Sequence, residues 1–343
     1  MYDHVAAALK AKPVRWLVTG AAGFIGSNLV ERLLMLGQIV TALDNFATGH
    51  HSNLESVRES VGEAAWSRFR LVEGDIRNPD DCRNACEGVR YVSHQAALGS
   101  VPRSVEDPAT SNNVNVDGFV NVLVAARDAK AARVVFASSS SVYGDHPALP
   151  KVEGVIGRQL SPYAVSKRAK ELYADVFGSC YGMEIIGLRY FNIFGARQDP
   201  NGAYAAVIPK WFDALLNGLP VYVNGDGETS RDFCFVENAV RANILAAMSD
   251  HPEACGKNYN VACGERTTLN ELFAALKTLA AKHNPEAAGA KAVYRAERPG
   301  DVRHSLADIT LARRLLGYEP AVKIKEGLEK ACEWYAGLAG RES

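Results

Sequence analysis

The sequence predicts an α/β protein built on a doubly wound parallel sheet and completed by a second, smaller α/β domain. Three observations support this fold class. Short apolar runs alternate with amphipathic segments of helical period as far as Tyr190. A glycine-rich turn follows the first apolar run. After Phe191 the alternation loosens, and a chain of 343 residues exceeds what one compact core usually supports.

The first part of the chain supplies most of the expected sheet. Short apolar runs predict strands at 14–19, 38–43, 69–73, 89–94, 133–138 and 184–190. Apolar residues at helical spacing predict helices at 24–36, 115–130 and 163–181. Strands that alternate with helices favour a parallel sheet that is covered on both faces.

The second part is less regular and contains one segment that resembles the first. We expect a loop at 195–206, a helix at 208–217, a strand at 221–224 and helices at 269–282 and 326–339. The run 258–262 is a candidate for one further sheet strand. The predicted domains are therefore 1–191, with a return segment near 234–263, and 192–343.

Composition excludes several classes of protein. The chain is 48% hydrophobic and 22% charged, which argues against disorder, and its net charge of -1 gives no electrostatic case for nucleic acid or an anionic membrane. Seven cysteines without a Cys-x-x-Cys pair argue against a disulfide framework or a metal site and favour the cytoplasm. No stretch approaches a membrane span, and the apolar patch within residues 1–13 is too short for a signal peptide.

The turn after the first strand is a candidate phosphate-binding loop. Gly20, Gly23 and Gly26 allow a sharp turn and close approach of the backbone, and the helix that follows presents free N–H groups to an anion. Asp44 ends the second strand, where a carboxylate accepts ribose hydroxyls and repels a 2′-phosphate, so the pattern favours NAD over NADP. Asp75 is either a contact to the adenine amino group or an ordinary turn residue.

A second group of residues predicts proton transfer. Tyr163 and Lys167 lie four residues apart on one helix face, where a neighbouring ammonium favours the phenolate. The four serines at 138–141 follow a predicted parallel strand at its carboxyl end, where ligands bind in such sheets. We expect the serines and the tyrosine to share one active site.

Together with other motifs, these residues resemble the extended short-chain dehydrogenase/reductase family, whose nucleotide-binding domain has a Rossmann-like fold. The further motifs are His94-Gln95-Ala96-Ala97, Asn115-Val116-Asp117-Gly118, Tyr143-Gly144 and Arg189-Tyr190-Phe191-Asn192. Within the family the chain is most similar to UDP-hexose 4-epimerases, and among them to the UDP-N-acetylglucosamine 4-epimerases of bacterial O-antigen and lipopolysaccharide biosynthesis. The resemblance implies NAD as cofactor and inversion of sugar C4 through a transient 4-keto sugar.

The resemblance also assigns residues to roles. It implies Tyr163, Lys167 and Ser139 as catalytic residues and no metal. It implies a cofactor site made of Gly20, Gly23, Phe24, Ile25, Gly26, Asp44, Asn45, Asp75, Ile76, Gln95, Ala96, Ala97, Tyr163, Lys167 and Tyr190. It implies a UDP-sugar site made of Ser139, Ser140, Ser141, Tyr163, Asn192, Ala206, Val207, Tyr222, Arg231, Arg298, Asp301 and Ser305.

Four positions depart from related enzymes. Dehydratases of the family carry Asp-Glu where Ser140 and Ser141 stand, so the acid and base for loss of water are missing here. Epimerases restricted to UDP-glucose and UDP-galactose carry a tyrosine where Ser305 stands, and the smaller residue leaves room for a 2-acetamido group. Gly99 replaces a lysine that contacts a cofactor phosphate, a loss for which Arg103 is a candidate compensation.

Other functions remain open at this point. They are a UDP-glucose/UDP-galactose epimerase, a UDP-uronic acid 4-epimerase, a nucleotide-sugar dehydrogenase that releases its keto product, and a dinucleotide sensor without activity. The resemblance further implies a homodimer that pairs the helices at 115–130 and 163–181 in a four-helix interface.

Overall fold

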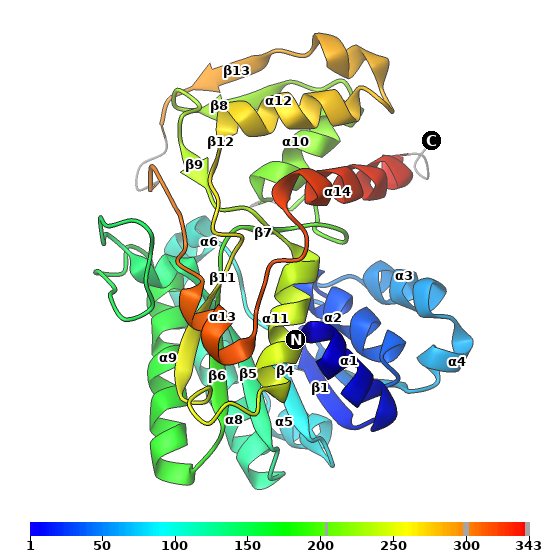
Figure 1. The fold of residues 1–343 in the computed structure, drawn as a ribbon, viewed down its shortest axis with the longest axis vertical. Helices are drawn as coiled ribbons and strands as arrows, with labels where there is room; N and C mark the ends of the chain where they lie inside the picture. Colours follow the sequence, from blue (N-terminus) through cyan, green and yellow to red (C-terminus); the bar gives the residue numbers. More distant parts are fainter. Residues whose placement is uncertain (203–204, 298–301, 340–343) are drawn as a thin grey trace.

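Seven parallel strands form the central sheet of the computed structural model, which describes residues 1–202, 205–297 and 302–339 (Figure 1). Their order across the sheet is β11-β6-β5-β4-β1-β2-β3, so the chain reverses its direction of travel between β1 and β4. The strands are β1 (Arg15–Thr19), β2 (Ile39–Asp44), β3 (Phe69–Glu73), β4 (Tyr91–His94), β5 (Arg133–Ser139), β6 (Ile185–Tyr190) and β11 (Lys257–Val261). All seven predicted sheet strands are confirmed, including the strand that joins from the second half of the sequence.

Alternate residues of each strand enter two different cores, as a pleated sheet requires. In β1, Trp16 and Val18 pack in one apolar cluster, whereas Leu17 packs in the other. The first cluster lies under α1 (Tyr2–Ala11), α2 (Phe24–Met35), α3 (His51–Val61) and α11 (Val236–Met248). The second lies under α5 (Pro79–Cys86), α8 (Gly118–Asp128) and α9 (Pro162–Tyr181). The sheet is therefore covered on both faces, and the predicted fold class is confirmed (Figure 1).

A separate group of elements lies above the carboxyl ends of the strands (Figure 1). It contains α10 (Val207–Leu216), α12 (Leu269–Ala280), α14 (Ile324–Ala339) and the parallel pair β8 (Val221–Asn224) and β13 (Ala292–Arg295). The predicted helices at 208–217, 269–282 and 326–339 are confirmed. Helix α12 begins at a capping box formed by Thr268 and Glu271, which satisfies free N–H groups at its start.

Shorter elements connect these layers. They are α4 (Glu63–Trp66), α6 (Val101–Glu106), α7 (Pro108–Asn112), η2 (Ser140–Tyr143), β7 (Ile193–Phe194), β9 (Ser230–Arg231), β10 (Cys234–Phe235), β12 (Thr267–Thr268), η3 (Pro285–Gly289) and α13 (Thr310–Leu316). None of the helices in the described ranges is long and apolar enough to cross a membrane.

Several helices, α1 and α11 among them, have no counterpart among the predictions. Helix α11 is buried on most sides, with ten buried residues, so it lacks the apolar stripe that marks an amphipathic helix in sequence. Helix α1 docks through Leu9, which is 1% exposed, and its Leu9 carbonyl accepts a 2.8 Å hydrogen bond from the Gln38 amide. The N-terminal residues therefore belong to the fold.

The predicted helix at 115–130 begins differently from expectation. Its first turn is a wide π-type turn, η1 (Asn113–Asp117), before regular geometry starts in α8. The Asn115 side chain accepts from Leu98 N at 2.8 Å and donates to the Ser166 hydroxyl at 3.0 Å. Because Ser166 lies on α9 between Tyr163 and Lys167, this turn braces the helix that carries the predicted catalytic pair.

Candidate active site

A cavity of about 680 Å³ lies at the carboxyl ends of the sheet strands, where the strand order reverses. Open α/β sheets bind ligands at this position. Every predicted cofactor residue lines it, as do four predicted substrate residues besides Tyr163. The predicted residues that line it are Gly20, Gly23, Phe24, Ile25, Gly26, Asp44, Asn45, Asp75, Ile76, Gln95, Ala96, Ala97, Tyr163, Lys167, Tyr190, Ser139, Ser140, Asn192 and Ala206.

The glycine loop is packed too closely for side chains. Gly20 has φ of +67°, and a Cβ on it would lie 2.7 Å from the backbone nitrogen of Ala96. A Cβ on Gly26 would overlap the carbonyl oxygen of Gly20. Gly23 begins α2 without a side-chain cap, so the first N–H groups of that helix are free for an anion in the cavity.

Asp44 serves the loop and also lines the cavity. Its two carboxylate oxygens accept hydrogen bonds of 2.8 Å from Ala22 N and Phe46 N. Burial raises the pKa of this carboxyl group, against the effect of these bonds. Because each carboxylate oxygen has a second acceptor site, Asp44 retains the capacity to accept from a ribose.

Asp75 lies in a turn and also lines the cavity, and its contact with adenine stays a prediction. The Arg77 guanidinium and the Asn45 amide donate to its carboxylate, at distances of 2.7 Å to Oδ2 in both cases. Hydrogen bonding to Arg77 is the main reason that the pKa of Asp75 falls to about 2. Asp75 also accepts from Arg77 N, as a turn aspartate does, while it lines the cavity.

A buried polar network supports the floor of the cavity. Tyr190 Oη donates to Gln95 Oε1 at 3.0 Å and accepts from Asn243 Nδ2 at 2.7 Å. Gln95 Nε2 in turn donates to Asn243 Oδ1 and to Ser93 Oγ, both at 2.9 Å. Since these groups satisfy one another, Gln95 and Tyr190 are fixed in place from below.

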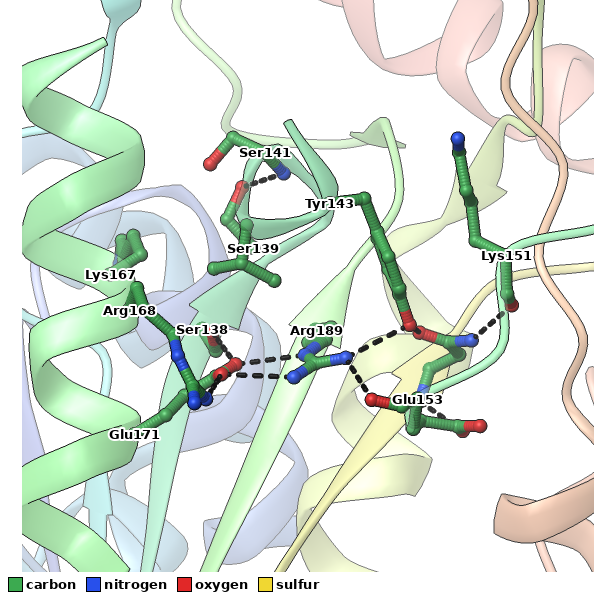
Figure 2. Close-up of polar contacts among 12 residues, drawn as sticks. Ser138, Ser139, Ser141, Tyr143, Lys151, Glu153, Lys167, Arg168, Glu171 and Arg189 are labelled. Carbon is green, nitrogen blue, oxygen red and sulfur yellow. Dashed lines mark hydrogen bonds and ion pairs between the residues drawn. The ribbon is translucent and has the colours of Figure 1, made fainter. Parts of the chain in front are cut away.

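The candidate catalytic residues converge from two elements. Ser139 ends β5, and its hydroxyl accepts from Ser141 N at 3.1 Å, which shapes the serine turn (residues 139–142) seen in Figure 2. Ser161 caps α9, and Pro162 is its first residue, so Tyr163 lies in the first turn of that helix. Lys167 lies one turn further and donates to Ala137 O at 3.0 Å.

Burial shifts both titratable groups of this cluster. It raises the pKa of the Tyr163 phenol, while a side-chain hydrogen bond with Ser139 opposes the rise. It lowers the pKa of Lys167 to about 8. The Lys167 Nζ atom lies 5.6 Å from the centre of the Tyr163 ring. The lowering of the Tyr163 pKa by Lys167 stays a prediction.

This geometry can be compared with that of known proteins. The sequence matches the model of the NAD dependent epimerase/dehydratase family over residues 16–262. The chain belongs to this family. NAD is accordingly its cofactor, in agreement with the sequence prediction.

Relatives of this epimerase/dehydratase are similar over almost the whole chain. The UDP-glucose 4-epimerase of Mycolicibacterium smegmatis is 38% identical, covering 94% of this chain and 98% of that one. UDP-N-acetylglucosamine 4-epimerase from Methanobrevibacter ruminantium, solved with UDP-N-acetylmuramic acid, is 37% identical with a TM-score of 0.85, covering 95% and 99%. UDP-glucuronic acid 4-epimerase from Bacillus cereus, solved with UDP-glucuronic acid and NAD, is 28% identical with a TM-score of 0.83, covering 94% and 99%.

Several predicted substrate residues do not line the cavity of this family member. They are Ser141, Val207, Tyr222, Arg231 and Ser305. Arg231 and Ser305 are nevertheless neighbours: Arg231 Nη1 donates to Ser230 O at 3.0 Å, and Ser305 N donates to the same carbonyl at 3.0 Å. The predicted contacts Arg298 and Asp301 lie outside the described residues.

Other lining residues were missed by the sequence analysis. They include Thr48, Gly49, Arg77, Thr110, Val114, Gln198 and Asp199. Most belong to loops without a recognisable motif, although the position of Gln198 and Asp199 before Pro200 is a turn signal. Gly99 and Arg103 also line the cavity, which keeps Arg103 a candidate for the phosphate contact that Gly99 cannot make.

The glycine loop generates a direct test of NAD binding. In Gly26→Ala the new methyl group must displace the Gly20 carbonyl. We therefore expect the Kd for NAD+ in calorimetric titration to rise by about tenfold or more. Gly154→Ala is the matched control, because Gly154 is exposed and its Cβ would meet open space. Equal affinity of the Gly26→Ala variant and wild type would contradict the assignment of this loop.

Proposed function

We propose that the protein is an NAD-dependent UDP-sugar 4-epimerase, with UDP-N-acetylglucosamine and UDP-N-acetylgalactosamine as its preferred pair. One observation carries the proposal: Tyr163, Lys167 and Ser139 line the same cavity as the glycine loop. The names of the relatives support the class of reaction. The elements above the sheet are proposed to bind the UDP-sugar.

The cavity fits the cofactor on structural grounds. The glycine cradle, the free N–H groups at the start of α2 and the Asp44 carboxylate are the donor and acceptor set that a dinucleotide requires. When bound, NAD+ would supply a reversible acceptor for the hydride of sugar C4. Lys167 would hold the nicotinamide ribose, and Gln95 and Tyr190 would line the opposite wall.

Proton transfer falls to Tyr163 and Ser139. The Tyr163 phenolate takes the proton of the sugar 4-hydroxyl and returns it after C4 has inverted. Ser139, which lines the same cavity, shares a hydrogen bond with the same oxygen. Because burial alone favours the neutral phenol, the base needs positive charge nearby, and the Lys167 ammonium supplies it.

Inversion also requires a fixed nucleotide and a mobile sugar. A guanidinium suits diphosphate oxygens, so Arg231 and Arg298 are proposed to hold the diphosphate, with Asn192 and Asp301 as further contacts. The small side chain of Ser140 leaves space in the cavity in which the 4-keto sugar can turn. Ser140 and Ser141 place no carboxylate before Val142, which disfavours loss of water.

A preference for 2-acetamido sugars is proposed from Ser305. This residue is half-buried beside Arg231, one of the proposed diphosphate contacts, and its side chain is small. A bulky ring at this position would fill the space beside the sugar, whereas serine leaves it open.

We also propose a homodimer. The outer face of α9 exposes Val165, Leu172 and Val176, each about half exposed, which is an apolar stripe of helical spacing. A second copy of α9 and of α8, packed as a four-helix interface, would cover it.

The substrate panel tests the proposal. Incubation with UDP-N-acetylglucosamine, UDP-glucose and their uronic acids, followed by NMR, should show C4 inversion without net NADH. Tyr163→Phe should lower kcat by about 1000-fold or more, because the general base is lost. The purified variant should keep the wild-type melting temperature. Near-normal turnover by this variant would remove Tyr163 as the base, and stoichiometric NADH would indicate a dehydrogenase.

The state of Lys167 predicts the alkaline limit of activity. Its pKa of about 8 means that the ammonium is present below this pH and is lost above it. We therefore expect kcat/KM to fall as the pH rises through about 8. Lys167→Arg keeps its charge to about pH 12 and should move this limb upward, even if the rate is lower. If kcat/KM of Lys167→Arg falls at the same pH as that of the wild type, the titrating group is not Lys167.

Ser305→Tyr tests the sugar preference. The added ring should lower kcat/KM for the acetylated pair by about tenfold or more and leave UDP-galactose within about threefold. Ser305→Ala is the matched control, because it keeps the space open. Equal losses on both substrates of Ser305→Tyr would contradict the pocket assignment.

A further inference from the structure

The inner face of α9 contacts the end of β5 at three successive turns. In the first turn, the Ser139 hydroxyl lies near enough to Tyr163 to oppose the rise of its pKa on burial. Lys167 donates to a backbone carbonyl of β5 at 3.0 Å in the second. In the third, Glu171 accepts from the Ser138 hydroxyl at 2.7 Å. The first two contacts belong to the proposed chemistry, whereas the third is not used by it.

Glu171 is a fully buried carboxylate whose oxygens are both occupied. One oxygen accepts from Ser138 Oγ and from Arg189 Nε at 2.8 Å, as Figure 2 shows. The other accepts from Arg189 Nη2 and from Arg168 Nη1, each at 2.9 Å. Arg189 comes from β6 and is 3% exposed in its side chain, so the central ion pair is closed to water. The Glu171 carboxylate therefore joins α9 to β5, through Ser138, and to β6, through Arg189.

Arg189 extends the network to the far end of the serine turn. Its Nη1 donates to Tyr143 Oη at 3.1 Å and to the Glu153 carbonyl at 2.9 Å. Tyr143 directly follows the serine turn, and Ser138 directly precedes it. The Glu171–Arg189 pair thus holds the turn at both of its ends, and the same carboxylate fixes the turn to the catalytic helix (Figure 2).

We propose that Glu171, through Arg189, is a positioning residue that holds the serine turn against α9 and so keeps the Ser139 and Tyr163 hydroxyls in contact. The inference rests on the proposed epimerase function and adds a residue to it. A guanidinium carries five donors in a rigid plane, so one Arg189 side chain can serve the carboxylate and the Tyr143 hydroxyl at fixed angles. A small displacement of such groups is costly to the rate, since proton transfer needs hydrogen-bond distance.

The alternative is that the ion pair only stabilises the fold. Buried ion pairs are weak evidence for stability in themselves, and removal of one partner leaves an uncompensated charge that can unfold the protein. Glu171→Gln alone cannot separate the two cases. Removal of one hydroxyl at either end of the turn keeps the ion pair and is the sharper probe.

The experiment compares three variants of the full-length, NAD-loaded enzyme. Ser138→Ala and Tyr143→Phe each remove one of the two hydroxyl contacts between the turn and the Glu171–Arg189 pair. Tyr143 does not line the cavity. Arg168→Gln is the matched control, because Arg168 binds the same carboxylate from the partly exposed side of α9. We expect about tenfold lower kcat in the first two variants, KM within about twofold, and near-wild-type kcat in the control. Ser138→Thr, which restores the hydroxyl, should recover most of the rate.

A second readout does not depend on turnover. Carbon-13 NMR of labelled tyrosine reports the pKa of Tyr163, whose signal is assigned with Tyr163→Phe. We expect this pKa to rise by about one pH unit in Ser138→Ala and in Tyr143→Phe. It should stay unchanged in Arg168→Gln. Wild-type inactivity on every UDP-sugar would refute the proposed function and leave this readout intact. An unchanged Tyr163 pKa and kcat in Tyr143→Phe, or a lower melting temperature with normal kcat in both variants, would overturn the positioning role.

Discussion

Parallel pairing of seven strands is the constraint on which the rest of this molecule depends. Because all strands point the same way, their carboxyl ends meet at one edge, and the loops that leave them come together from distant parts of the sequence. The reversal of strand order between β1 and β4 opens that edge into a cavity. The glycine loop, the serine turn and the start of α9 are neighbours for this reason alone.

Much of this arrangement could be predicted from local sequence patterns. Short apolar runs predicted the strands of the sheet, and glycines after the first run predicted the close-packed turn into α2, because both patterns arise from neighbouring residues. Helix α11 was missed because it is apolar on most sides, and α1 because a short patch carries little signal. Gln198, Asp199 and the Glu171–Arg189 pair depend on contacts between distant segments, which no local spacing reveals.

The electrostatics of the site run against its proposed chemistry when the chain is considered by itself. Burial favours a neutral phenol at Tyr163 and weakens the charge of Lys167. His94 and Lys170, buried nearby, are likewise held toward their neutral forms by burial. Such a site favours the phenolate only with positive charge beside it, which the Lys167 ammonium supplies below about pH 8 and bound NAD+ would increase. The negative charge of Glu171 is paired with Arg168 and Arg189, so it does not replace the positive charge that Tyr163 needs beside it.

Helix α9 carries charged side chains on its buried face, beside the apolar contacts of Ala174 and Phe177, and exposes several apolar side chains on its outer face. Its inward face carries Lys167, Lys170 and Glu171, while Val165, Leu172 and Val176 point away from the core. Because charged groups occupy part of the inner face, apolar side chains of this helix remain exposed to water on the outer face. Charged replacements in that outer row would lower its tendency to associate and are the place to engineer a soluble single subunit, because the row faces away from the cavity.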